Sequence, residues 1–157
     1  MKFIDLLEQD QVVLNAPFIS KKRLFEFVAN KMADESCSQM PIYQSFVDRE
    51  KLGNTSLGNG VAIPHGKCLL HTEEVLIKLI RLSKVSDYES TDGNSVGFIV
   101  AMAFPVHVRD IHKQIMKEAV QIFKQHRLYK GLLQAESRKE VIDLILETHQ
   151  QCSNWSS

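Results

Sequence analysis

Apolar residues recur at helical spacing in the first third of the chain. In residues 20–35 they lie three and four positions apart, which places them on one helix face, and Ser20 is a typical N-cap residue. Pro41 suits the first turn of a second helix, expected through residues 42–52, because its missing N–H needs no partner there. The apolar positions of the first helix are Leu24, Phe25, Val28, Ala29 and Met32.

Runs of apolar residues in the middle of the chain predict strands. Residues 96–104, VGFIVAMAF, contain no polar side chain, as expected for a strand that is buried on both faces of a sheet. Residues 75–82 are apolar except for Lys78 and Arg81 and also predict a strand, with a helix as the alternative. The shorter expected elements are a helical turn at residues 3–7, strands at 11–14, 55–57 and 61–63, and a turn at Asp92-Gly93.

The last third of the chain is predicted to be helical. One helix is expected at residues 110–123 and a shorter one at 127–135, because apolar positions again recur at helical spacing. Ser137 and Glu140 have the spacing of a capping box, so a third helix begins there, and we expect it to end near Thr148.

The order of these elements predicts the fold class. Helices, then strands, then helices indicate a single α/β (α+β) domain over residues 1–150, with a mixed β-sheet sandwiched between helices. Residues 151–157 are expected to be a frayed tail. A chain of 157 residues with 44% hydrophobic residues is long enough to bury one sizeable core.

Charge and cysteine content narrow the class of protein. The formal net charge is zero, which argues against nucleic acid or an anionic membrane as a partner and leaves a homodimer open. Cys37, Cys68 and Cys152 are odd in number and lack metal-ligand spacing, so we expect a reducing, cytoplasmic environment. The N-terminus becomes acidic too early for a secretory signal, and no stretch approaches the roughly 20 apolar residues of a membrane span.

His65 is the first candidate for chemistry. Pro64 fixes its own φ and favours extended geometry at Ile63, so the segment VAIPHGK predicts a stiff strand end. Gly66 leaves room beside the imidazole, and we expect an open turn here. Neutral imidazole is populated near pH 7 and can attack phosphorus. The structural alternative is a surface histidine in a glycine-rich loop.

The segment before His65 is a candidate anion site. Its glycines allow backbone N–H groups to point into a concavity, and its short side chains add further donors. Arg49 lies one helix end earlier and can supply a guanidinium for phosphate, or form a weak ion pair at an exposed helix position. The candidate donors of the loop are Thr55, Ser56, Gly58, Asn59 and Gly60.

Other chemistries fit the sequence less well. A P-loop would need Ser or Thr after Gly66-Lys67, where Cys68 follows, and GxGxxG is absent, so neither ATP nor a dinucleotide is expected. The histidines and cysteines lack the spacing of a zinc site. The GxSxG elbow of hydrolases is also missing. We therefore expect no metal and no cofactor.

Residues 49–67, REKLGNTSLGNGVAIPHGK, resemble the signature of IIA proteins of the bacterial phosphotransferase system, fructose/mannitol type. They are close to the form RExxGSTGIGNGIAIPHGK of the nitrogen-regulatory branch. Residues 20–29 resemble the first helix of that branch, and residues 112–137 align without gaps with its C-terminal helices. The departures are Asn54, Ser56-Leu57 and the weakly matching residues 68–95.

The resemblance implies roles for individual residues. The phosphorylated histidine of the family falls on His65, and its active-site arginine falls on Arg49. Its second active-site histidine falls on His112, with His107 as the competing residue. The phosphate-binding residues would be Thr55, Gly58, Asn59 and Gly60, and the histidines interpreted as surface residues are His71, His126 and His149.

The resemblance also implies partners. A small histidine-phosphorylated carrier protein (HPr- or NPr-like) would donate the phosphoryl group, and regulatory target proteins linked to nitrogen and potassium would respond to the phosphorylation state. In this interpretation the protein turns over no small molecule by itself. The alternative is a sugar-specific IIA unit that passes phosphate to a IIB component in fructose/mannitol-type uptake. A third interpretation is a binding module with the fold but without phosphotransfer.

Overall fold

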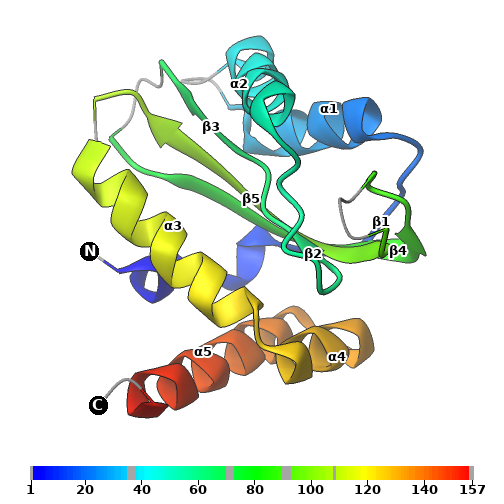
Figure 1. The fold of residues 1–157 in the computed structure, drawn as a ribbon. Coiled ribbons are helices and arrows are strands. Elements are labelled where there is room, and N and C mark those ends of the chain that lie inside the picture. Colours follow the sequence, from blue (N-terminus) through cyan, green and yellow to red (C-terminus); the bar gives the residue numbers. More distant parts are fainter. Residues whose placement is uncertain (1, 35–37, 70–72, 90–92, 108, 156–157) are drawn as a thin grey trace.

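The computed structural model describes residues 2–34, 38–69, 73–89, 93–107 and 109–155, and Figure 1 traces them from blue to red. The helices and strands follow one another along the chain in the order given next. They are η1 (Phe3–Leu6), η2 (Gln9–Gln11), β1 (Val12–Ala16), α1 (Lys21–Met32), α2 (Gln39–Leu52), β2 (Val61–Ala62), β3 (His65–Cys68), β4 (Leu76–Ser86), β5 (Val96–Pro105), α3 (Arg109–Phe123), α4 (His126–Gln134) and α5 (Arg138–Trp155), where η marks a 3-10 helix.

The strands form one mixed sheet. Its order is β1-β4-β5-β2, and β3 also pairs with β5. β4 and β5 are antiparallel, whereas β1 is parallel to β4, and β2 and β3 are both parallel to β5. β2 and β3 follow each other along β5, with Val61 opposite Phe98 and His65 opposite Met102.

Helices cover both faces of this sheet (Figure 1). α1 and α2 pack on one face, and α3, α4, α5 and η1 pack on the other. All ten residues of β5 are buried, and from Phe98 to Phe104 their side chains alternate between the two cores. The predicted single domain, with a mixed sheet between helical layers, is therefore confirmed.

Capping contacts mark the predicted helix starts. Ser20 Oγ accepts a hydrogen bond of 3.2 Å from a backbone N–H in the first turn of α1, which confirms its N-cap. Pro41 lies in the first turn of α2. Ser137 Oγ accepts from the Glu140 N–H at 3.1 Å, but the Glu140 carboxylate accepts from the Glu136 N–H at 2.7 Å. The predicted capping box at α5 is therefore only half formed.

Both long apolar runs form strands. β5 agrees with the predicted residues 96–104 to within one residue. β4 is longer than the predicted residues 75–82, because its antiparallel pairing with β5 continues until Ser86 lies opposite Val96. The polar residues after position 82 therefore belong partly to a strand, since backbone pairing does not require apolar side chains.

The short strand predicted at residues 55–57 is almost absent. Ser56 and Ala62 form a single isolated antiparallel bridge, made by the Leu57–Val61 and Ile63–Thr55 backbone hydrogen bonds, and no longer pairing follows. Cys37, His71 and Asp92, which the sequence interpretation names, lie outside the described residues.

The last helix is longer than predicted. We expected an end near Thr148, but α5 continues to Trp155. Cys152 is buried in this extension, with its Sγ 4.0 Å from a backbone carbonyl oxygen of α3, and this packing extends the helix. The domain boundary at residue 150 stays a prediction. Across the described ranges, every helix falls short of the length and apolar character that crossing a membrane would require.

Arg81 connects the sheet to the helices of one face. It lies on β4, and its Nε donates to the Leu14 carbonyl of β1 at 3.1 Å. Its Nη1 donates to the carbonyls of Leu132 and Ala135, at the end of α4. The last carbonyls of a helix lack intrahelical partners and carry partial negative charge, so a guanidinium stabilises them. The arginine that interrupts an apolar run is thus a structural residue.

Replacing Arg81 by methionine should lower the free energy of unfolding by about 2 kcal/mol, because three backbone carbonyls lose a charged donor. Urea denaturation at pH 7 measures this change. Lys84→Met, which removes an exposed cation from the same strand, is the matched control and should change stability much less. Equal losses in the two variants would contradict the structural role of Arg81.

Candidate functional site

His65 is the first residue of β3, and one of its ring nitrogens is bound to the backbone. Its Nδ1 lies 2.9 Å from the carbonyl oxygen of Ile63. A carbonyl oxygen can only accept a hydrogen bond, so this contact requires the proton on Nδ1. In the neutral ring, Nε2 is then the nitrogen that carries the lone pair.

The surroundings of His65 are more enclosed than the predicted open turn. The imidazole is partly buried, and Gly66 is fully buried. A Cβ at Gly66 would overlap Ser45 of α2, so this glycine makes room for the helix and not for the imidazole. The expectation of an open turn is therefore wrong, because α2 packs directly on the backbone of β3.

His112 of α3 is the histidine that the structure brings against His65. The two ring centroids lie 5.9 Å apart with an interplanar angle of 76°, an edge-to-face contact. The His112 ring also stacks on the ring of Phe104 of β5, with the two centroids 4.1 Å apart. His107, the competing residue, lies just beyond β5 instead, with Nε2 4.0 Å from the Glu73 carboxylate.

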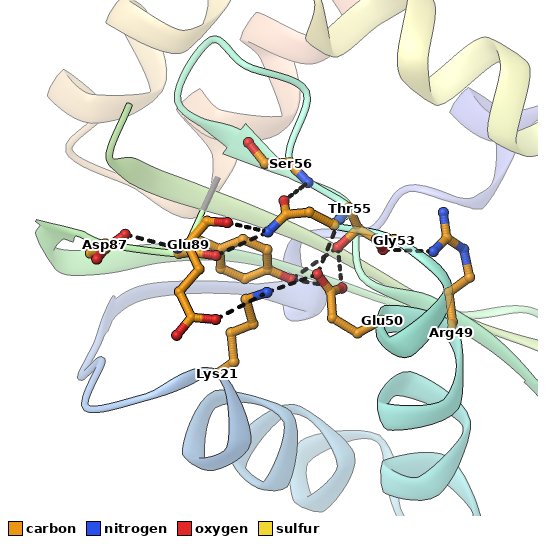
Figure 2. A network of polar contacts seen from close by, with 10 residues as sticks. Lys21, Arg49, Glu50, Gly53, Thr55, Ser56, Asp87 and Glu89 are labelled. Atoms are coloured by element: carbon orange, nitrogen blue, oxygen red, sulfur yellow. Dashed lines mark hydrogen bonds and ion pairs between the residues drawn. The ribbon is translucent and has the colours of Figure 1, made fainter. Parts of the chain in front are cut away.

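Arg49 lies in the last turn of α2, close enough for its charge to lower the pKa of His65. Its Nη1 donates to the carbonyl oxygen of Gly53 at 2.8 Å, and Figure 2 shows the guanidinium turned toward this residue. The side chain thereby stabilises the C-terminus of its own helix. The structure therefore places Arg49 beside the site with part of its guanidinium bound to backbone.

Glu50, which the sequence did not single out, is the centre of a polar network (Figure 2). Its carboxylate accepts hydrogen bonds from the N–H and Oγ1 of Thr55, at 3.1 and 2.6 Å. Lys21 Nζ lies 3.1 Å from the same carboxylate, and the Tyr88 hydroxyl lies 3.4 Å from it. These partners come from α1, from the loop and from the segment after β4, so no local sequence pattern could indicate the network.

Polar side chains of the loop before His65 hold the loop in shape. Thr55 binds Glu50, as described, and Asn59 Nδ2 donates to the Phe123 carbonyl at the end of α3, at 2.7 Å. The Gly58 N–H donates to a side-chain hydroxyl within the loop at 3.2 Å. These predicted phosphate-binding groups are therefore engaged by the protein itself.

Gly60 is fixed by a close approach of α4. Its φ is +97°, a left-handed conformation that side chains rarely adopt, and the ring of Tyr129 occupies the place of a Cβ. Its carbonyl accepts hydrogen bonds from the N–H groups of Gly97 and Phe98, at 2.9 and 3.3 Å. Gly60 thus attaches the loop to β5 and α4.

Burial and positive charge keep both imidazoles neutral near pH 7. Burial lowers the pKa of His65, and Arg49 and Lys67 lower it further, while a backbone hydrogen bond and Glu50 oppose this shift. Burial, then Lys67 and His65, lower the pKa of His112 to about 4. Lys67 was missed in the sequence, although its position two residues after His65 on a strand indicates the same face.

The remaining histidines and cysteines have other surroundings. His126 is exposed at the start of α4, as predicted, whereas His149 of α5 is only partly exposed. His71 lies outside the described residues. Cys68 and Cys152 are buried thiols, which agrees with the interpretation of Cys68 as a small packing residue.

The arrangement suits nucleophilic attack by His65 on an electrophilic group that then stays bound to the imidazole and carries negative charge. One imidazole nitrogen is held as a donor and the other carries a lone pair, so His65 can act as a nucleophile without losing a proton. Arg49 and Lys67 supply positive charge, and neutral His112 supplies a ring N–H. A phosphoryl group matches these properties.

Residues 5–148 match the family described as "Phosphoenolpyruvate-dependent sugar phosphotransferase system, EIIA 2". A curated relative, the "Nitrogen regulatory protein homolog" of Haemophilus influenzae, is 28% identical over 145 residues. That match covers 90% of this chain and 88% of the relative.

Solved structures agree with this assignment. The nitrogen regulatory protein IIA-Ntr from Neisseria meningitidis has a TM-score of 0.83 and 29% identity, over 90% of this chain and 97% of that one. A chain in the complex of enzyme IIAMTL and phosphorylated enzyme IIBMTL from Escherichia coli has a TM-score of 0.72 at 17% identity, over 90% and 97% of the two chains, which shows a common fold. Because the family match spans nearly the whole chain, the protein belongs to the EIIA type 2 family of the phosphoenolpyruvate-dependent sugar phosphotransferase system.

Proposed function

We propose that this chain is a regulatory phosphocarrier that accepts a phosphoryl group on Nε2 of His65. The observation that carries the proposal is the 2.9 Å hydrogen bond from Nδ1 to the Ile63 carbonyl, which leaves Nε2 as the nucleophile. Burial lowers the pKa of His65, so the lone pair is available near pH 7. The role is a relay, because the product is the modified side chain of the protein itself.

The transfer step needs no proton to move. The Nε2 lone pair attacks the phosphorus of a phosphohistidine on the donor protein, and a new N–P bond forms while the donor's N–P bond breaks. The electron pair of that bond returns to the donor imidazole. The Nδ1 proton of His65 stays in place, and its hydrogen bond to Ile63 strengthens as the ring gains positive charge. A nucleotide is not needed, because the donor already carries the reactive phosphoryl group.

Arg49 and His112 act on the phosphoryl oxygens. A guanidinium has five N–H donors, so Arg49 can bind an oxygen while retaining its contact with Gly53. Neutral His112 donates a ring N–H, which stabilises negative charge that develops during transfer. Thr55, Gly58, Asn59 and Gly60 contribute by holding the loop in shape.

The relatives named nitrogen regulatory proteins support a regulatory role, in which the phosphorylation state of His65 controls binding to target proteins. The donor is a small histidine-phosphorylated carrier protein (HPr- or NPr-like). In the sugar-specific alternative, the chemistry at His65 is the same and a IIB component is the acceptor. A homodimer stays a prediction for both roles.

Phosphorylation of His65 can be tested by intact mass spectrometry. After incubation with phosphoenolpyruvate and the general phosphotransferase proteins, the wild type should gain the mass of one phosphoryl group, and His65→Ala should gain none. His126→Ala removes an exposed histidine and is the matched control, which should be labelled like the wild type. A phosphoryl group on His65→Ala would overturn the assignment.

The regulatory and sugar-specific roles differ in where the phosphoryl group goes. If the role is regulatory, labelled protein mixed with a fructose- or mannitol-type IIB component should keep its phosphoryl group on His65. Electrophoresis under conditions that preserve phosphohistidine measures the distribution of the label. Rapid transfer to the IIB component would favour the sugar-specific alternative.

His112 should make stability depend on pH. Between pH 6.5 and about 4 the unfolded chain binds a proton at this residue that the folded protein does not, so the free energy of unfolding falls as the pH falls through this window. His112→Gln removes this contribution and should lose less stability between these pH values, as urea denaturation would measure. His126→Gln should follow the wild type. Identical pH dependence in wild type and His112→Gln would contradict the lowered pKa.

A further inference from the structure

Glu50 joins three segments around the start of the loop that leads to His65. It lies next to Arg49 in the last turn of α2, and only 10% of its side chain is exposed. As described above, its carboxylate accepts hydrogen bonds from Thr55, Lys21 and Tyr88. A buried carboxylate with this many hydrogen-bond donors fixes the groups that it binds.

A continuous series of hydrogen bonds runs from Glu50 to the imidazole of His65. The Glu50 carboxylate binds the N–H and Oγ1 of Thr55. The carbonyl of Thr55 accepts from the Ile63 N–H at 2.9 Å. The carbonyl of Ile63 accepts from Nδ1 of His65 at 2.9 Å. The group that fixes the tautomer of His65 is therefore itself held by the residue that Glu50 binds.

Other contacts hold the same part of the loop. Asn54 Nδ2 donates to the carbonyls of Tyr88 and Glu89, at 3.2 and 2.8 Å, and its Oδ1 accepts from the Ser56 N–H at 2.8 Å. Lys21 lies 3.8 Å from the Glu89 carboxylate (Figure 2). Asn54 is thus attached to the segment after β4, the Ser56 N–H is attached to Asn54, and Thr55 itself is attached to Glu50.

We propose that Glu50 is a positioning residue for phosphoryl transfer, which acts through Thr55 and Ile63 to hold His65 in the Nδ1–H tautomer with Nε2 toward the donor. This inference rests on the proposed function of His65. Glu50 touches neither the imidazole nor the phosphoryl group in this scheme. It determines which ring nitrogen carries the lone pair and how the ring is oriented.

Two substitutions at this position separate hydrogen bonding from charge. Glu50→Met has a similar length but no acceptor, so the Thr55 N–H and hydroxyl lose their partner. Glu50→Gln keeps an acceptor for the Thr55 N–H, and its amide can donate to the hydroxyl oxygen. If positioning through Thr55 is the role, Glu50→Gln should behave much like the wild type and Glu50→Met should not.

The tautomer of His65 can be measured without any phosphate. Long-range ¹H–¹⁵N NMR spectra of the ring distinguish Nδ1–H from Nε2–H. The wild type and Glu50→Gln should show Nδ1–H, whereas Glu50→Met should show a mixture of the two tautomers. Thr55→Val removes the hydroxyl contacts with Glu50 and Tyr88 but keeps the N–H contact with Glu50, so it is milder than Glu50→Met and should show an intermediate mixture. If Glu50→Met does not fold, the tautomer of Thr55→Val tests the role of Glu50 in its place.

The rate of phosphorylation gives a second measurement. Phosphoramidate is a small donor whose N–P bond breaks with release of ammonia, so no partner protein is needed. Glu50→Met should lower the maximal rate about tenfold, with little change in the half-saturating donor concentration, because orientation and not binding is impaired. Glu50→Gln should recover most of this rate.

Two controls separate positioning from general destabilisation. Tyr88→Phe removes the contacts of this hydroxyl with Glu50 and with the Thr55 hydroxyl, at 3.4 and 3.0 Å, but leaves both hydrogen bonds from Thr55 to Glu50. Its tautomer and rate should therefore match the wild type. Val28→Ala destabilises the buried face of α1 away from this series of hydrogen bonds and should also keep the tautomer.

Each remaining outcome decides the inference. It is overturned if both Glu50→Met and Thr55→Val keep the wild-type tautomer and rate, or if Val28→Ala changes them equally. It is also overturned if Glu50→Gln is as impaired as Glu50→Met, which would assign the effect to charge. If the wild type takes no phosphate on His65, the proposed function fails, while the tautomer measurement still decides the role of Glu50.

Discussion

Burial of β5 on both faces is the constraint on which the arrangement of the site depends. From Phe98 to Phe104 its side chains alternate between the two cores, so helices must cover the sheet on both sides. β3 pairs with the second half of β5, which places His65 beside Met102, and α3 packs over the same region, where His112 stacks on Phe104. The two histidines meet because both are attached to one stretch of one strand.

Local patterns predict most of the fold, and the exceptions depend on distant partners. A short stretch of sequence is enough to predict α1 from its periodic apolar residues and β5 from its continuous apolar run. The ends of β4 and α5 cannot be predicted in this way. Ser86 is in the sheet through its pairing with Val96, and Cys152 is helical in a stretch that packs on α3. Such contacts are set by the tertiary structure.

The same distinction separates the parts of the candidate site. His65 stands out through Pro64 and the glycine-rich segment before it, whereas His112 is reached only through the family resemblance, because its contact joins a helix to a strand. Glu50 and Tyr88 lie 38 positions apart, and no sequence spacing connects them. The short polar residues of the loop were expected to face an anion, but such side chains readily bind nearby backbone and side-chain groups.

Arg81 has a consequence for the order in which the chain folds. Its guanidinium joins β4 to residue 14 on one side and to residues 132 and 135 on the other, contacts that span 67, 51 and 54 positions of sequence. Closing such long loops costs chain entropy before the contacts contribute favourable energy. The Arg81 contacts are therefore expected to form late, after the local helices and the β4–β5 pairing. Interactions that form after the transition state chiefly slow unfolding. Arg81 therefore acts less on how fast the chain folds than on how long the N-terminal strand and the C-terminal helices remain together once it has folded.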